Sequence, residues 1–169
     1  MNDFITEFTP KKSYQIRMST KVNADTLSKV INQDFQPVKV SDKKFSVLYV
    51  YYLVDRKIIY NESQSNVLYI GSTVGEKNGN KRTLGFRFKH LKSGRDSKQN
   101  IILSYYYNLD YRIGLDIYFV EDCRETEKQY IYDFIIRYHS QPVAQGASYS
   151  SKFAKYITKN SNNLWCKKK

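Results

Sequence analysis

Apolar residues along the chain fall first into two short runs with the character of strands. The longer one, residues 46–55, reads Ser-Val-Leu-Tyr-Val-Tyr-Tyr-Leu-Val-Asp and is dominated by β-branched and aromatic side chains. Such a run predicts a buried strand. A second run at residues 67–70 ends at Gly71 and follows a polar loop, so the pair predicts an antiparallel hairpin. The apolar residues 58–60 are expected to add pairing inside it.

Farther along the chain the apolar spacing becomes helical. Leu84, Phe88 and Leu91 recur at i, i+4 and i+7, which predicts an amphipathic helix ending near Gly94, after a solvated loop. The remaining elements expected from the pattern are a helix at residues 98–109, a strand at 115–120 and a helix at 125–139. Together they predict an α/β (α+β) fold with a small antiparallel three-stranded central sheet flanked by helices.

Three regions are expected. Residues 1–45 form a polar N-terminal extension that packs on the core, with a short helix capped by Asn23. Residues 46–145 form the core domain. Residues 146–169 form a basic tail in which a short helix could form near residues 153–157.

The charge balance of the chain indicates what kind of partner it binds. Lys and Arg total 28 against 16 Asp and Glu, a net charge of +12. This balance favours a polyanionic partner, most often nucleic acid, although basic charge can also serve solubility alone. Two cysteines make neither a structural zinc site nor a disulfide framework, and no segment has the length of a signal peptide or membrane span. A cytoplasmic location is expected.

Three sets of side chains could carry chemistry. Glu127 lies four residues before Ile131 and therefore on the apolar face of its helix, where it needs a cation, donors or a metal; its place near the helix N-terminus is an equally good explanation. Arg87 and His90 are neighbours on the helix predicted around residues 84–91, where each could also have a structural role. Tyr49 and Tyr69 occur in the two hairpin strands, positions that also suit simple packing.

The order of these residues is more specific than any one of them. Val47-Leu48-Tyr49, then Tyr69-Ile70-Gly71-Ser72-Thr73, then Arg87 with His90, then Glu127, resembles the GIY-YIG nuclease superfamily. The resemblance covers about residues 46–145. Val47 stands in place of the first glycine of the family, the Arg87–His90 spacing is one residue short of the family's usual spacing, and Gln145 is the nearest polar substitute for its late asparagine.

The resemblance implies a metal-dependent endonuclease that hydrolyses phosphodiester bonds in DNA, and double-stranded DNA is the expected substrate. Glu127 is then the ligand of one Mg²⁺ or Mn²⁺ ion, Tyr49 deprotonates or orients the attacking water, and Tyr69 positions water or phosphate. Arg87 neutralises the developing charge and His90 supports by hydrogen bonding. Basic side chains expected to grip the DNA backbone are Lys43, Lys44, Lys81, Arg82, Lys89, Lys167 and Lys168.

In its small size the chain resembles stand-alone restriction-type nucleases and nucleases encoded by phages or mobile elements. The sequence leaves the oligomeric state open, including a dimer on DNA. Two other classes remain open from the sequence. One is a non-catalytic, basic, tyrosine-rich protein that stacks nucleic acid strands on its 16 tyrosines. The other is a structural or partner-binding protein in which the Tyr-Ile-Gly string is incidental.

Overall fold

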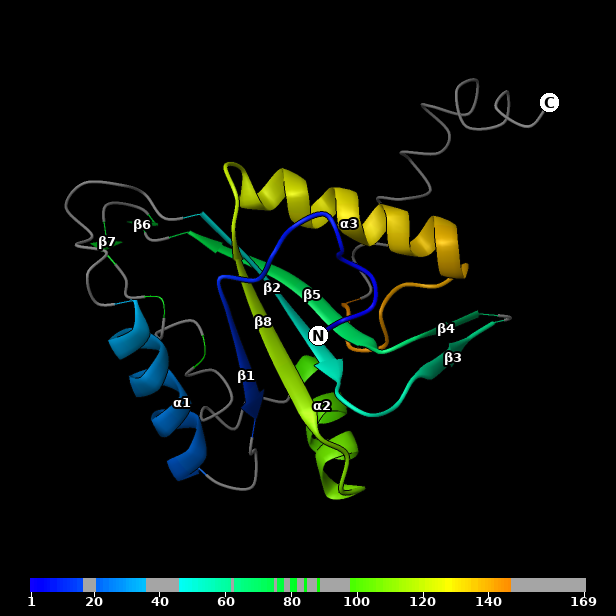
Figure 1. Cartoon of the computed structure of the whole chain (residues 1–169), viewed down its shortest axis with the longest axis horizontal. Coiled ribbons are helices and arrows are strands. Elements are labelled where there is room, and N and C mark those ends of the chain that lie inside the picture. Colours follow the sequence, from blue (N-terminus) through cyan, green and yellow to red (C-terminus); the bar gives the residue numbers. More distant parts are fainter. Residues whose placement is uncertain are drawn as a thin grey trace.

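The computed structural model describes residues 1–16, 21–35, 46–61, 63–74, 76–77, 80–81, 84, 88 and 98–146. Within them the main sheet is antiparallel and four-stranded, in the order β1-β8-β2-β5 (Figure 1). The strands are β1 (Lys12–Ile16), β2 (Ser46–Leu53), β3 (Ile58–Tyr60), β4 (Ser63–Ser65), β5 (Val67–Val74), β6 (Glu76–Lys77), β7 (Asn80–Lys81) and β8 (Ile113–Phe119). The helices are α1 (Lys21–Asp34), α2 (Lys98–Asn108) and α3 (Cys123–Tyr138).

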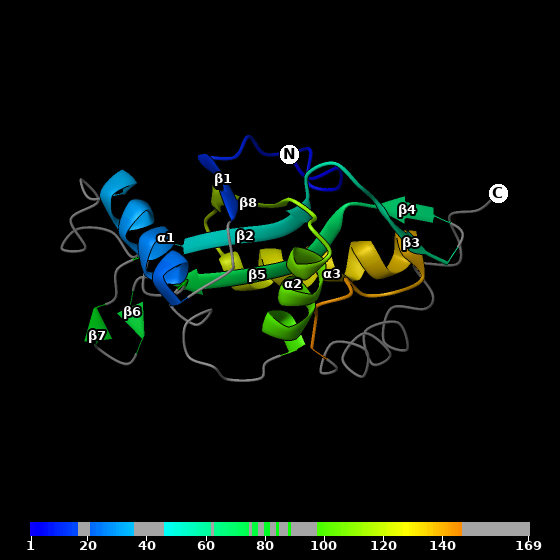
Figure 2. The same ribbon diagram turned by 90° about the horizontal axis from the view of Figure 1, so that it is seen from below.

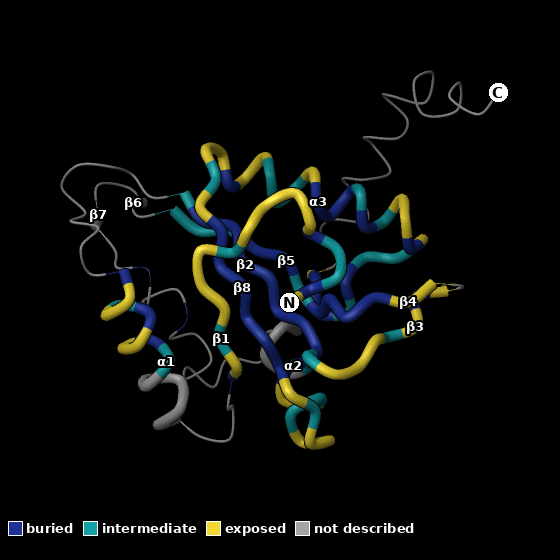
Figure 3. Tube along the Cα trace, in the orientation of Figure 1, coloured by how far each residue is buried: buried dark blue, intermediate teal, exposed yellow. Residues whose placement is uncertain are grey.

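Strand β2 is the centre of the sheet and confirms the strongest prediction from the sequence. Its residues from Val47 to Leu53 are all buried, as a nearly continuous apolar run requires (Figure 3). It pairs with β5 on one side and β8 on the other, both antiparallel. In this register Tyr49 lies opposite Gly71 and Tyr51 opposite Tyr69.

Alternate residues of β2 face two separate cores, because successive side chains of a strand point to opposite sides of the sheet. Val47, Tyr49, Tyr51 and Leu53 pack in one core with Ile31 of α1, with Phe35 directly after α1 and with Leu103 of α2. Leu48 and Val50 pack with Ile70 of β5 and with the residues of α3 that point to the sheet, Tyr130, Ile131, Phe134 and Tyr138. No helix in the described part of the chain combines the length and apolar character needed to cross a membrane.

The sheet has one strand more than the sequence indicates, because β1 from the N-terminal region pairs with β8. An edge strand needs little apolar surface, and of its five residues only Ile16 is buried. Two further strand pairs lie outside the main sheet: residues 58–60 pair with β4, and β6 pairs with β7 inside the expected loop. Of the helix expected around residues 84–91, only Leu84 and Phe88 are described, and both are buried.

The N-terminal segment is held to the sheet through a buried carboxylate. Asn2 donates from Nδ2 to Asp116 Oδ2 of β8 at 2.9 Å and to the Tyr118 hydroxyl at 2.6 Å. Its own Oδ1 accepts from the backbone N–H of Phe4 and of Ile5. The segment therefore lies across the sheet on the side opposite α2, above the sheet in the view of Figure 2.

Asp116 is fully buried and is satisfied by several donors at once. Besides Asn2, the Tyr52 hydroxyl donates to Asp116 Oδ1 at 3.1 Å, and the Tyr118 hydroxyl lies 3.4 Å from Oδ2. Burial raises the pKa of the Tyr52 and Tyr118 phenols, and the charge of Asp116 raises both further. A buried carboxylate held in this way is costly to leave without its donors.

Replacing Asn2→Ala should therefore lower the free energy of unfolding by about 2–4 kcal/mol, since it removes donors from a buried charge and the acceptor for two backbone N–H groups. Urea unfolding measures the change. The matched control is Asn108→Ala at an exposed position of α2, expected to change stability by no more than about 0.5 kcal/mol. Equal losses in the two variants would show that Asn2 anchors nothing.

Candidate active site

Two tyrosines of the hairpin form a packed pair. The rings of Tyr49 and Tyr69 are stacked, with centroids 6.0 Å apart and planes inclined by 29°. The Tyr49 ring also meets the Phe88 ring edge-on at 5.3 Å. Tyr49 is completely buried, whereas Tyr69, on the edge strand β5, is only partly buried. Of the two phenols, Tyr69 is thus the one that solvent reaches.

Gly71 allows this pair to form. A Cβ atom at this position would lie 2.5 Å from Cε1 of Tyr69 and 2.6 Å from both Cζ and the hydroxyl oxygen of Tyr49. These separations are far inside van der Waals contact, so any larger residue must displace both rings. The glycine of the Tyr-Ile-Gly string is therefore required by close approach of the phenols to the backbone of β5.

The carboxylate singled out from the sequence meets the residue that follows this glycine. Ser72 donates from Oγ to Oε2 of Glu127, across 55 residues of chain. Asp122, rather than Glu127, caps α3, accepting from the backbone N–H of Arg124 and Glu125. Glu127 lies in the second turn, partly buried, and points to the sheet as its spacing from Ile131 predicts. The position of Glu127 is thus explained by its hydrogen bond to a residue distant in the sequence, and not by the helix terminus alone.

The phenol pair and the carboxylate flank the same two residues of β5. Consecutive strand residues project to opposite faces, so the side of Gly71 carries the tyrosine rings and the side of Ser72 carries Glu127. Strand β5 is the last strand of the sheet on this side. The two groups are therefore brought to one stretch of the sheet edge, from its two faces.

A divalent cation is compatible with the donor set at this edge. Glu127 provides a carboxylate whose Oε2 accepts from Ser72, so that its orientation is held. Mg²⁺ is often bound through one or two carboxylates while it keeps several waters. Within the described residues no three His, Cys, Asp or Glu side chains come together as a metal-binding group, so Glu127 offers a sparse site and not a closed protein cage.

Gln145 has a structural place. Its side-chain Nε2 donates to the carbonyl of Ile70 at 3.0 Å and its Oε1 accepts from the N–H of Ile70 at 3.2 Å. Beside it, the N–H of Ala144 donates to the carbonyl of Leu68. The amide thus acts as a short extra strand that closes part of the β5 edge. The sequence alone suggests Gln145 as a polar substitute for the late asparagine of the family. It does not reveal that the Gln145 side chain pairs with the backbone of Ile70.

Several candidate residues lie outside the part of the chain that the structure describes. These are Arg87, His90, Lys43, Lys44, Arg82, Lys89, Lys167 and Lys168. Lys81 is placed only as backbone, in β7. In contrast, Ser72 was not proposed from the sequence as a site residue, although it belongs to the Tyr-Ile-Gly-Ser-Thr string that drew attention to β5.

No protein-family model, curated protein or solved structure matches the chain. The function is therefore inferred from the residues themselves. The contacts that carry it are the tyrosine pair over Gly71 and the bond from Ser72 to Glu127.

Gly71→Ala should lower the free energy of unfolding by about 1–3 kcal/mol, because the new methyl group forces the Tyr49 and Tyr69 rings out of their positions. Thermal or urea unfolding measures this. Gly146→Ala is the matched control, since nothing lies within 4 Å of a Cβ there. If both variants were as stable as the parent, the close packing of the phenols on Gly71 would be contradicted.

Proposed function

We propose that the chain is a divalent-metal-dependent endonuclease of the GIY-YIG type that hydrolyses phosphodiester bonds in DNA. The observation that carries the proposal is the hydrogen bond from Ser72 to Glu127. It joins the residue directly after the Tyr-Ile-Gly string to the carboxylate that the sequence assigns to the metal. Two sequence features that were identified separately are thus in contact, one on strand β5 and the other on helix α3.

The topology supports the same proposal. The hairpin β2–β5 carries both tyrosines, β8 adds to the other side of β2, and α3 follows β8 and packs on the hairpin. This order brings Tyr69 and Ser72 of β5 beside Tyr49 of β2 and Glu127 of α3. A scissile phosphate bound at the β5 edge could contact Tyr69 and Glu127.

The exposure of the two phenols refines their roles. Tyr49 was expected to act on the attacking water, but it is fully buried, whereas Tyr69 is partly exposed on the edge strand. We therefore assign the orientation or deprotonation of water to Tyr69. Tyr49 supports it by stacking against its ring. This division needs no movement of the core residue Tyr49.

Glu127, oriented by Ser72, is the residue that would hold the cation, Mg²⁺ or Mn²⁺. When bound, that ion would stabilise the negative charge on the phosphate and on the departing 3′ oxygen. Arg87 is proposed to bind the phosphate through its planar guanidinium group, and His90 to support by hydrogen bonding. The net charge of +12 supports a DNA partner.

The burial of the tyrosines disfavours the alternative of a non-catalytic protein that stacks single strands. Stacking needs exposed rings. Of the fourteen tyrosines whose burial the structure describes, eight are buried, namely Tyr49, Tyr51, Tyr52, Tyr60, Tyr118, Tyr130, Tyr132 and Tyr138. The high tyrosine content thus serves the two cores to a large extent.

Glu127→Gln should reduce Mg²⁺-dependent cleavage of plasmid DNA by at least about a hundredfold, because the amide cannot replace the charge of a metal ligand. Ser72→Ala should reduce it by about tenfold, since only the orientation of the carboxylate is lost. Conversion of supercoiled plasmid to nicked or linear forms measures both, and EDTA should abolish the activity of the parent protein.

Glu125→Gln is the matched control, an exposed carboxylate of the same helix, expected to leave cleavage unchanged. Circular dichroism verifies that each variant is folded. Parental activity in folded Glu127→Gln, or cleavage that persists in EDTA, contradicts the proposal.

DNA binding by the inactive Glu127→Gln protein should weaken steeply as salt rises, because lysine contacts to phosphates release counterions. Changing Lys43 and Lys44 together to Ser should reduce the slope of log K against log salt by about 2. Lys128→Ser serves as control, since Lys128 already bonds to Glu125. Fluorescence anisotropy with a labelled duplex measures the slopes, and identical slopes in all three proteins would remove Lys43 and Lys44 from the interface.

A further inference from the structure

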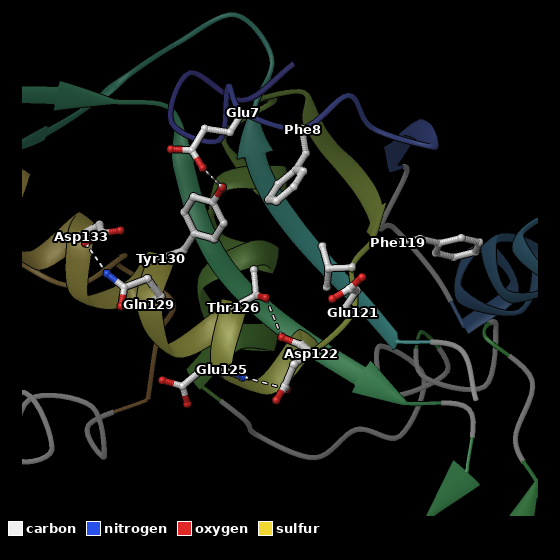
Figure 4. A pocket seen from close by; sticks show the side chains of 11 residues that line it. Glu7, Phe8, Phe119, Glu121, Asp122, Glu125, Thr126, Gln129, Tyr130 and Asp133 are labelled. Carbon is white, nitrogen blue, oxygen red and sulfur yellow. Dashed lines mark hydrogen bonds between the residues drawn. The ribbon is translucent and has the colours of Figure 1, made fainter. Parts of the chain in front are cut away.

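A surface groove lies between the N-terminal segment, the end of β8 and α3, with a volume of about 870 Å³ (Figure 4). Its lining residues are Glu7, Phe8, Phe119, Val120, Glu121, Asp122, Glu125, Thr126, Gln129, Tyr130 and Asp133. Glu127 is not among them, because its side chain points to β5 from another side of the helix. The groove is therefore separate from the candidate active site.

The apolar lining of this groove is centred on Phe8 of the N-terminal segment, which is 42% exposed. Its ring packs edge-on against Tyr130 at 6.4 Å, which fixes one apolar wall, and Val120 also lines the hollow. Phe119 lines the groove as well, but its ring points away from it and contacts Phe35 at 5.3 Å (Figure 4). An exposed aromatic ring in a partly apolar hollow is typical of a site that binds a partner.

The charge of the groove is opposite to that of the chain. Among the described residues that line it, five are carboxylates and none is Lys or Arg, although the chain has a net charge of +12. The start of a helix explains two of them: Asp122 caps α3, and Glu125 lies in its first turn. It does not explain Glu7, on the opposite wall, or Asp133, in the third turn.

Glu7 and Asp133 both line the groove, and each accepts a hydrogen bond from a side chain of α3. The Tyr130 hydroxyl donates to Glu7 Oε2 at 3.1 Å, and Gln129 Nε2 donates to Asp133 Oδ1 at 2.8 Å. Burial raises the pKa of Asp133; the hydrogen bond from Gln129 opposes this, and the charge of Glu7 adds to it. A cation placed between the two carboxylates would relieve this repulsion.

We infer that this groove docks a cationic segment of a partner protein, in which lysines or arginines flank one aromatic or large aliphatic residue. The apolar residue packs against Phe8 and Val120, and the basic residues meet Glu7, Asp133 and the carboxylates near the start of α3. DNA is repelled from this face by its own charge, so the groove and the basic surfaces of the chain select different partners.

The test uses the full chain and a fluorescein-labelled peptide of sequence Lys-Lys-Trp-Lys-Lys, followed by fluorescence anisotropy at low ionic strength. Two labelled peptides are controls: Lys-Lys-Ser-Lys-Lys removes the anchor, and Glu-Glu-Trp-Glu-Glu reverses the charge. The first peptide should bind about fivefold or more tightly than the second, and the third should not bind. Its affinity should fall as salt rises.

Groove variants locate the binding. Glu7→Gln combined with Asp133→Asn should weaken binding of the first peptide by about fivefold, and Phe8→Ser by a similar factor. The matched control is Asp110→Asn, an exposed carboxylate after α2 with a positive φ that Asn also adopts readily; it should change affinity by less than about twofold. Circular dichroism verifies folding of each variant.

Three outcomes overturn the inference. The first is equal affinity in the groove variants and Asp110→Asn. The second is equal binding of the acidic and basic peptides. The third is binding that appears only after Lys152, Lys155 and Lys159 are all changed to Ser, because the C-terminal segment of the chain itself would then be the occupant instead of a partner. None of these measurements depends on nuclease activity.

Discussion

The register between β2 and β5 sets the geometry of the whole candidate site. With Tyr49 opposite Gly71, the two phenols stack over a residue that has no side chain, and Ser72 points to α3. A shift by one residue would move every side chain of β5 to the other face. Such a shift would bring a side chain under the tyrosine rings and take the hydroxyl away from Glu127. The packing of two distinct cores on the two faces of β2 holds this register in place.

A buried charge extends the same sheet to the N-terminal segment. Asp116 has no salt bridge in the described part of the chain and is instead satisfied by Asn2, Tyr52 and Tyr118. Because an unsatisfied carboxylate in a core is strongly unfavourable, the segment that brings Asn2 is tied to β8. That attachment also places Glu7 and Phe8 against α3, where they form one wall of the acidic groove. Fold stability and a binding surface therefore depend on one polar cluster.

The two proposed interactions would use groups of opposite charge on one small protein. The excess of lysine and arginine is consistent with the proposed DNA substrate, and the carboxylates that line the groove are consistent with the inferred cationic partner. Both interactions would use α3, on different sides of the helix. Glu127 faces the sheet, whereas Asp122, Gln129 and Asp133 face the groove. A protein bound in the groove would thus leave Glu127 and the β5 edge accessible to DNA.

Local pattern was enough for the elements that bury long apolar runs or stripes. The run at residues 46–55 predicted β2, and the spacing of Ile131 and Phe134 predicted that α3 would turn Glu127 to the sheet. Strand β1 could not be predicted in the same way, because an edge strand buries few side chains and its sequence looks like a polar extension. For this reason the sequence predicted three strands, whereas the main sheet has four.

The sequence by itself determined which residue types are available: two tyrosines on a predicted hairpin, a glycine two residues after the second tyrosine and a helix-borne carboxylate, in an order that resembles one nuclease superfamily. Only the tertiary structure decided their relations. It buried Tyr49 and left Tyr69 partly exposed, paired Ser72 with Glu127, paired Gln145 with the backbone of Ile70, and brought Glu7 and Asp133 to the same groove. The reason is physical: burial and hydrogen bonding between residues more than fifty positions apart depend on strand register and helix packing, which no local spacing contains.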